Sequence, residues 1–187
     1  MHAISGLYSN GFGSAGQAGA YYCGRSPRDR WRSHDERTSA VTTLDEAFAL
    51  AGSEHGLAVV ATLRADQAIQ ASLVNVGLLP HPATKEPILG FVTYGRIKLA
   101  NLRERPQLAV TFRNGWQWAT VEGRAELAGP DDPQPWLDAK DLPELLREIF
   151  RSAGGTHDDW GEYDRVMAEQ RRAAVLVKPT RVYTNRG

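Results

Sequence analysis

The 187-residue sequence lacks the features that mark disulfide-bonded, zinc-binding and membrane proteins. It has one cysteine, Cys23, which excludes an internal disulfide, a Cys-x-x-Cys redox pair and a cysteine-rich zinc site. No apolar run approaches the roughly 20 residues that a membrane-spanning helix requires. The N-terminus also lacks the basic, apolar and small-residue order of a signal peptide. Because a lone thiol suits a reducing compartment, we expect a cytoplasmic protein with no membrane partner.

An excess of charge of either sign is also missing. Lysine plus arginine and aspartate plus glutamate each number 22, so the chain lacks the basic surplus that would indicate a nucleic-acid partner. The charge is nonetheless unevenly placed. Residues 95–113 carry five cations and one carboxylate, whereas residues 122–148 carry eight carboxylates and three cations. The cations are therefore concentrated where an anion could bind.

The first 40 residues show neither a helical nor a strand period, and glycine, serine and alanine dominate their first half. This composition predicts a disordered N-terminal extension over residues 1–40, followed by one folded domain over residues 41–187. The stretch GFGSAG at residues 11–16 matches the dinucleotide-binding pattern Gly-x-Gly-x-x-Gly. No apolar strand precedes it and no amphipathic helix follows it, so we assign it to the extension.

From residue 42 onward the sequence alternates between strand-like and helix-like periods. A short helix is expected from an N-cap at Thr42 or Thr43 to about Gly52. Strands are predicted at 56–63, 68–79, 88–94, 107–114, 116–129 and 173–184, and helices at 96–105, 141–153 and 159–171. Strands in meander order with helices mainly near the end predict an α+β fold built on a small antiparallel barrel. They do not fit alternating βαβ units.

The basic segment 96–105 has helix formers throughout and ends before a proline. At about 100° per residue its leucines face inward, and the adjoining face carries three donors: Lys98, Asn101 and Arg105. Arg96 lies at the helix N-terminus, where free amides and the helix dipole favour an anion. Phosphate or carboxylate binding is one interpretation, and a solvated face paired with residues 122–148 is the other.

The stretch WQW follows the hairpin signal Asn114-Gly115. In a strand, Trp116 and Trp118 project to the face opposite a core-like set: Ala119, Val121, Ala125 and Leu127. Tryptophans outside the core are typical of a partner interface or a flat ligand. Packing of the two indoles against the C-terminal helices is the alternative.

No metal site and no catalytic base are predicted. His81 lies in a turn region, and His157 lies beside Thr156 and Asp158, which look like helix N-cap residues rather than metal ligands. A lone histidine without convergent partners seldom forms an acid–base or metal site.

Three ordered segments together resemble a known family. They are RIKLANLRERP from residue 96, GWQWATVEGRAEL from residue 115, and GGTHDDWGEYDRVMAEQRRAAVLV with the later RVY. This series is similar to the actinobacterial flavin/deazaflavin oxidoreductases of the pyridoxamine 5′-phosphate oxidase-like group, in the branch that uses coenzyme F420. The similarity spans residues 43–184, and its specificity comes from the order of the segments.

The resemblance implies a split β-barrel homodimer that holds its cofactor in a groove at the subunit interface. It implies that Arg96, Lys98 and Asn101 contact the phosphate and the nearby anionic tail of the cofactor. It also implies that the strand QASLVN lines the ring system and that the indoles lie on the cofactor side, which gives five further site residues: Ser72, Val74, Asn75, Trp116 and Trp118.

The expected activity is hydride transfer from reduced coenzyme F420 to a small unsaturated or conjugated acceptor. The chain then has to fix the ring face, exclude water and supply a proton source where the product requires one. Two alternatives stay open at this point. One is an FMN-dependent enzyme with pyridoxamine-phosphate-oxidase-like chemistry, and the other is a non-catalytic carrier of a flavin, deazaflavin or haem.

Overall fold

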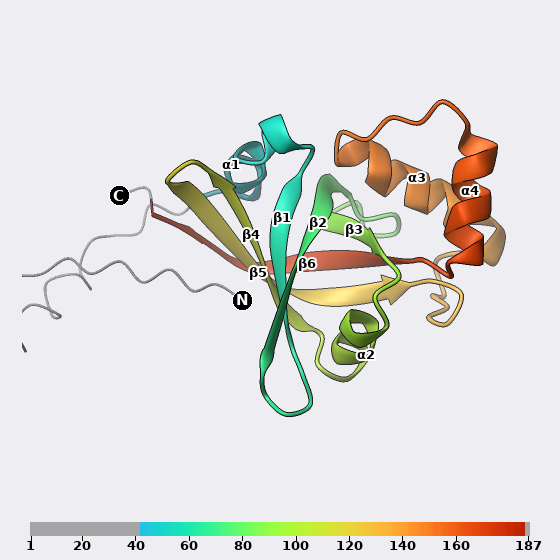
Figure 1. The fold of residues 1–187 in the computed structure, drawn as a ribbon, viewed down its shortest axis with the longest axis horizontal. Coiled ribbons are helices and arrows are strands. Elements are labelled where there is room, and N and C mark those ends of the chain that lie inside the picture. Colours follow the sequence, from blue (N-terminus) through green and yellow to red (C-terminus); the bar gives the residue numbers. More distant parts are fainter. Residues whose placement is uncertain (1–41, 186–187) are drawn as a thin grey trace, which may run out of the picture. The chain divides into compact units, whose positions relative to one another are not determined.

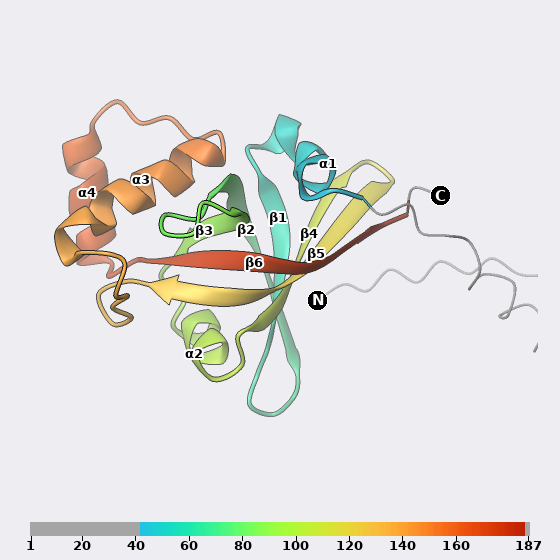
Figure 2. The same ribbon diagram turned by 180° about the vertical axis from the view of Figure 1, so that it is seen from behind.

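The computed structural model describes residues 42–185 (Figures 1 and 2). The predicted extension over residues 1–40, with its glycine motif and Cys23, lies outside the described residues. None of the helices within 42–185 is long and apolar enough to cross a membrane.

The strands and helices follow the pattern that the sequence predicts, with boundaries shifted by a few residues at most. The strands are β1 (Leu57–Leu63), β2 (Ile69–Pro80), β3 (Pro87–Thr93), β4 (Gln107–Asn114), β5 (Gln117–Ala128) and β6 (Ala173–Thr184). The α-helices are α1 (Leu44–Ala49), α2 (Arg96–Glu104), α3 (Leu142–Ser152) and α4 (Trp160–Glu169), and 3₁₀ turns lie at η2 (Gly52–Glu54) and η3 (Ala139–Asp141).

The six strands close into an antiparallel barrel in the order β1-β2-β3-β6-β5-β4. Consecutive strands pair as hairpins in β1–β2, β2–β3 and β4–β5, and β6 closes the barrel between β3 and β5. The long β6 crosses the molecule from the helical side to the β4–β5 hairpin (Figure 1). The predicted α+β barrel is confirmed.

The barrel interior is filled by alternate residues of the strands. In β4 the predicted inward set is buried: Leu108, Val110 and Phe112. In β5 Ala119, Val121 and Leu127 are buried as expected, because alternation places every second side chain on one face. The opening helix also forms as predicted. Thr43 is its N-cap and makes a capping box with Glu46.

Helices α3 and α4 cover the barrel on the side away from the β4–β5 hairpin (Figure 2). A second apolar cluster joins them to β2, β3 and β6, and it includes Leu146, Ile149 and Leu176. The approach is close at Gly77 of β2, where a Cβ atom would lie 1.9 Å from the hydroxyl of Ser152. Only glycine permits this contact, so α3 lies directly on β2 and forms part of one wall of the site described below.

Candidate functional site

A cavity of about 850 Å³ lies between β2, the β3–α2 connection and the first turn of α2. We call it the cationic cavity. Its described lining contains three cations and no carboxylate: Arg96, Lys98 and Arg172. A cavity with this charge balance is suited to an anionic ligand.

Five of the eight predicted site residues line the cationic cavity. Ser72, Val74 and Asn75 come from β2, and Arg96 and Lys98 come from α2. The fold brings them together because β2 pairs with β3, and α2 begins only three residues after β3 ends. Their proposed contacts with a cofactor stay predictions.

The N-terminus of α2 opens into the same cavity. Gly95 is the N-cap and provides no side-chain cap, and the first turn contains no acidic residue. Gly95, Arg96, Ile97 and Lys98 all line the cavity. The amides of the first turn have no intrahelical acceptor, and the positive end of the helix dipole lies there. Backbone and side chains therefore present positive charge to the same space.

Lys98 is a buried cation without a counter-ion. Its exposed fraction is 6%, and its ammonium lies 5.3 Å from the centroid of the Phe91 ring. Within residues 42–185 it forms no salt bridge, and burial lowers the pKa of its ammonium group. A buried charge in this state is destabilising unless it is paired, so a bound anion would relieve the unfavourable desolvation.

Ser72 provides a second unsatisfied group at the cavity wall. Its hydroxyl oxygen is buried and has no hydrogen-bond partner among the described residues. An unpaired buried hydroxyl is unfavourable and calls for a partner from outside the chain. Together with the cations, this hydroxyl fits a ligand that carries both an anionic group and hydrogen-bonding groups on its ring system.

Asn101 is placed differently from the other predicted residues. It is buried, and its amide nitrogen donates to Thr62 Oγ1 and to Gln70 Oε1, each at 3.1 Å. It is not part of the cavity lining, although Gln70 is. Asn101 thus joins α2 to β1 and β2 and holds a cavity residue in place.

Arg105, the third residue of the predicted donor face, and its neighbour Arg103 are both used within the fold. Arg105 donates from Nε to the carbonyl of Leu63. Arg103 makes a two-point contact with Asp132, which raises the pKa of the guanidinium. Pairing with residues 122–148, the alternative in the sequence interpretation, is therefore observed for Arg103.

Replacing Asn101 by leucine is expected to lower the free energy of unfolding by about 1 to 3 kcal/mol, because buried partners on β1 and β2 lose their donor. Cofactor affinity should fall less than in a variant that lacks Lys98. Urea denaturation and cofactor titration of the same preparation test this. A large loss of affinity with unchanged stability would instead show that Asn101 contacts the ligand.

The two tryptophans lie at the β4–β5 hairpin, outside the cationic cavity of their own chain. The prediction that both project from one strand is wrong for Trp116, which lies in the two-residue turn after Asn114 and is 94% exposed. Asn114 pairs with Gln117, so the turn residues are Gly115 and Trp116 rather than Asn114 and Gly115.

Trp118 lies in β5, is 36% exposed and contacts the last strand. Its ring meets Tyr183 edge to face at 6.0 Å, so it packs on β6. Asn185 accepts a hydrogen bond from the Trp118 amide and donates one to the Trp116 carbonyl. The end of the chain therefore fixes the backbone of both tryptophans and leaves one indole exposed.

The wall residues that were not identified from the sequence include an aromatic–cation pair and a helix residue: Tyr94, Arg172 and Phe150. Tyr94 follows β3, Phe150 belongs to α3 and Arg172 precedes β6. The guanidinium of Arg172 lies 4.5 Å from the centroid of the Tyr94 ring. The pair of arginines before β6 is the only sequence signal, and it does not reveal a contact across 78 residues.

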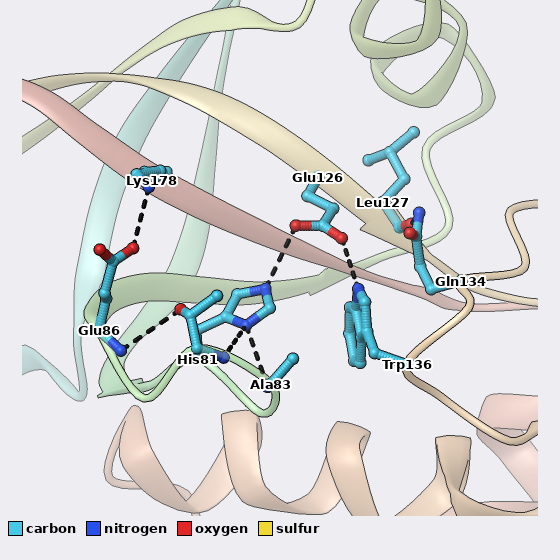
Figure 3. A network of polar contacts seen from close by, with 9 residues as sticks. His81, Ala83, Glu86, Glu126, Leu127, Gln134, Trp136 and Lys178 are labelled. Atoms are coloured by element: carbon cyan, nitrogen blue, oxygen red, sulfur yellow. Dashed lines mark hydrogen bonds and ion pairs between the residues drawn. The ribbon is translucent and has the colours of Figure 1, made fainter.

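His81 belongs to a separate polar network with a structural role (Figure 3). The backbone amides of Ala83 and Thr84 donate to its Nδ1 at 3.1 and 3.2 Å, so Nε2 carries the proton and donates to Glu126 at 3.2 Å. Trp136 donates to the other oxygen of Glu126 at 2.6 Å. Each nitrogen of this buried ring has a partner within the fold.

Replacing His81 by phenylalanine should lower the free energy of unfolding by about 1 to 3 kcal/mol, because two backbone amides and Glu126 lose a partner. Cofactor affinity should not change. The exposed His157, replaced in the same way, is the control: its Nδ1 accepts a hydrogen bond from one exposed amide, that of Asp159, so stability should fall by less than in His81→Phe. Lost cofactor binding in a stable His81→Phe protein would contradict the structural role.

Structural comparison shows the same fold in several solved proteins. The conserved protein Rv2991 of Mycobacterium tuberculosis matches with a TM-score of 0.57 at 17% identity, over 80% of this chain and 88% of that chain. A protein of Clostridium acetobutylicum related to general stress protein 26 matches with 0.51 at 14% identity, over 76% and 87%. A haem-binding protein of Mycobacterium smegmatis matches with 0.51 at 14%, over 78% and 55%.

A family comparison covers nearly the whole described chain. The model of the pyridoxamine 5′-phosphate oxidase family matches residues 44–186, which include every strand of the barrel, every residue named above for the cationic cavity, and both tryptophans. At identities of 14 to 17%, these three structural matches establish the fold alone. The chain therefore belongs to the pyridoxamine 5′-phosphate oxidase family and has its split β-barrel fold.

Proposed function

We propose that the chain is an oxidoreductase that binds coenzyme F420 in the cationic cavity and transfers a hydride to a small unsaturated or conjugated acceptor. The observation that carries the proposal is Lys98, a buried cation that has no counter-ion in the described chain and lines a cavity without carboxylates. Members of a family named for an oxidase of a phosphorylated compound offer precedent for redox chemistry on this barrel.

The residues have separable roles in this proposal. Arg96, Lys98 and the first-turn amides of α2 bind the phosphate and the anionic tail. Ser72, Val74 and Asn75 on β2 line the ring system, and the orphan hydroxyl of Ser72 donates or accepts one hydrogen bond. When bound, the reduced deazaflavin supplies the hydride, so no protein nucleophile is needed.

A second copy of the chain is proposed to complete the site. The outer face of the β1–β2 hairpin exposes two cross-strand apolar pairs, Val59 with Leu73 and Leu63 with Ile69. Their exposed fractions are 39, 64, 36 and 74%, respectively. A continuous apolar strip of this kind is typical of a subunit interface. Because β2 carries Leu73 beside Ser72 and Val74, a partner that covers this strip would also lie next to the cavity.

The exposed indole of Trp116 fits the same arrangement. It is on the β4–β5 hairpin, at the far end of the barrel from α3 and α4 (Figure 1). It is not among the residues that line the cationic cavity of its own chain. We propose that Trp116, with Trp118 behind it, contributes to the cofactor site of the partner subunit.

An FMN-dependent enzyme is the second candidate, and the family match favours it directly. One phosphate would satisfy Arg96 and Lys98 as well as a longer anionic tail would. Arg172 is the third cation of the lining. The anionic tail of coenzyme F420 would give Arg172 a partner, and we therefore place coenzyme F420 first.

Equilibrium titration of the purified protein with coenzyme F420 and with FMN separates the two candidates. The proposal predicts tighter binding of coenzyme F420, followed by oxidation of its reduced form in a screen of unsaturated acceptors. Preferential binding of FMN would overturn the choice of cofactor. Tight deazaflavin binding without turnover across a broad acceptor panel would favour a carrier, and binding of haem alone would favour a haem carrier.

A further inference from the structure

A second compartment adjoins the cationic cavity near the end of α3. It measures about 320 Å³ and has seven lining residues: His55, Asn75, Phe150, Ala153, Gly154, Gly155 and Thr156. We call it the His55 compartment. Asn75 and Phe150 line both spaces, so the two spaces share a wall, and a ligand in one lies beside a ligand in the other.

His55 is held rigidly at the entrance of β1. It is the C-cap of η2 and has the left-handed conformation, with φ 50° and ψ 48°, that often ends a helix and that histidine tolerates. The next residue, Gly56, has φ 68°, and a Cβ atom there would lie 2.0 Å from the Val76 carbonyl oxygen. Asn75 donates from Nδ2 to the His55 carbonyl at 2.8 Å. The helix end and this hydrogen bond together fix the backbone of His55.

The ring of His55 is also oriented. Its Nδ1 lies 3.1 Å from the carbonyl oxygen of Gly154. A carbonyl only accepts, so Nδ1 carries the proton and Nε2 of the neutral ring is an acceptor. Nε2 has no hydrogen-bond partner among residues 42–185, and the ring lines the compartment. A ligand with an O–H or N–H group could supply that partner.

The end of α3 provides an uncharged part of the wall. Helix α3 ends in a Schellman motif, in which Gly154 and Gly155 donate to the carbonyls of Arg151 and Phe150 at 2.9 Å each. Gly155 lies against the Phe150 ring, since a Cβ atom there would be 2.5 Å from Cζ. The lining of this compartment has no lysine, arginine or carboxylate, in contrast to the cationic cavity.

We propose that the His55 compartment binds the electron acceptor, as a small, uncharged, planar conjugated molecule whose hydroxyl or N–H group donates to Nε2 of His55. The Phe150 ring and the glycine peptides provide a surface for a flat molecule, and the volume suits a small ligand. The inference rests on the proposed function, because an acceptor is needed only if the adjoining cavity holds a redox cofactor. His55 is a binding and orienting residue in this account.

Equilibrium binding of 4-hydroxyacetophenone, with 4-methoxyacetophenone as the analogue without a donor, tests the proposal by calorimetry without turnover. The protein is loaded with whichever oxidised cofactor binds. We expect His55→Asn to weaken binding of the hydroxyl compound about tenfold. It should leave cofactor affinity and the weak binding of the methoxy compound unchanged. Asparagine is chosen because it accepts a positive φ.

His157→Asn is the matched control, since it replaces another exposed histidine, which lines neither space. It should bind both ketones as the wild type does. A second variant, Thr156→Val, alters the compartment without touching the backbone at His55, and a modest loss of affinity for the hydroxyl compound is expected. Thermal unfolding of each variant confirms that it is folded.

The failure of this inference and that of the proposed function give different results. If the cofactor binds but the hydroxyl ketone does not, the acceptor site is overturned and the cofactor assignment stands. The same holds if the wild type and His55→Asn bind the hydroxyl ketone equally well. If neither coenzyme F420 nor FMN binds, the proposed function fails. His55-dependent ketone binding to the unloaded protein would then show a ligand site without a redox role, which also contradicts an acceptor site.

Discussion

Replacing Lys98 by methionine is expected to weaken cofactor binding by about 1.5 to 3 kcal/mol, or roughly 10- to 150-fold. The substitution keeps most of the length and the apolar character of the side-chain stem and removes the charged donor. A charge-assisted contact with a phosphate is lost, and the low exposure of the site makes that contact stronger than one in water. Fluorescence or calorimetric titration measures the change.

The same substitution should not destabilise the unliganded protein. In the absence of a ligand, the Lys98 ammonium is buried without a counter-ion, so methionine removes an unfavourable desolvation and should leave stability equal or higher. Opposite signs for affinity and stability distinguish a binding residue from a structural one. Lys140→Met is the control, because this lysine is exposed on η3 and lies outside the cavity lining.

The pH dependence of stability provides an independent check on Lys98. Burial lowers its pKa in the folded chain, so between that pKa and the ordinary lysine value the unfolded chain binds more protons. The free energy of unfolding contributed by this group therefore rises with pH across that window. Chemical denaturation at several alkaline pH values should show the free energy of unfolding of the wild type approaching that of Lys98→Met as the pH rises. If Lys98→Met binds the cofactor as tightly as the wild type does at every pH tested, Lys98 does not contact the cofactor.

Replacing Leu73 by aspartate is expected to raise the dissociation constant of the proposed homodimer at least 100-fold. The residue is 64% exposed and pairs with Val59 on the apolar outer face of β1 and β2. An unpaired carboxylate buried in an apolar interface costs several kcal/mol, and the symmetry of a dimer introduces it twice. Sedimentation velocity over a range of concentrations measures the shift from dimer to monomer.

Cofactor affinity should fall together with dimerisation, because the proposed site needs the partner's hairpin and because Leu73 itself lines the cationic cavity. Ala139→Asp adds the same charge at an exposed position on η3 and should change neither property. A wild-type protein that is monomeric at all concentrations would contradict the dimer. A monomeric Leu73→Asp protein that binds cofactor normally would show that one chain forms the whole site.

The fold could be predicted from the sequence because each helix and strand has its own local signal. Alternation placed Leu108, Val110 and Phe112 on one face of β4, and all three are buried in the barrel. Thr43 and Glu46 supply the capping box that begins α1. Such signals depend on neighbours within a few positions, which a single sequence contains in full.

The site was less predictable because its geometry depends on contacts between distant segments. Helical periodicity put Lys98 and Asn101 on one donor face, yet only Lys98 reaches the cavity, since Asn101 bonds to Thr62 and Gln70 on β1 and β2. His55 and Gly154 are 99 positions apart and meet through the packing of α3 on β2. No local pattern encodes either contact.

A crystal structure of the protein with coenzyme F420 bound tests the central claim most directly. The account predicts that the cofactor's phosphate lies within hydrogen-bonding distance of Arg96 and Lys98, at a cleft between two copies of the chain, with its ring along β2. Cofactor density at another place would contradict it. So would a cofactor bound by a monomer whose cationic cavity faces open solvent.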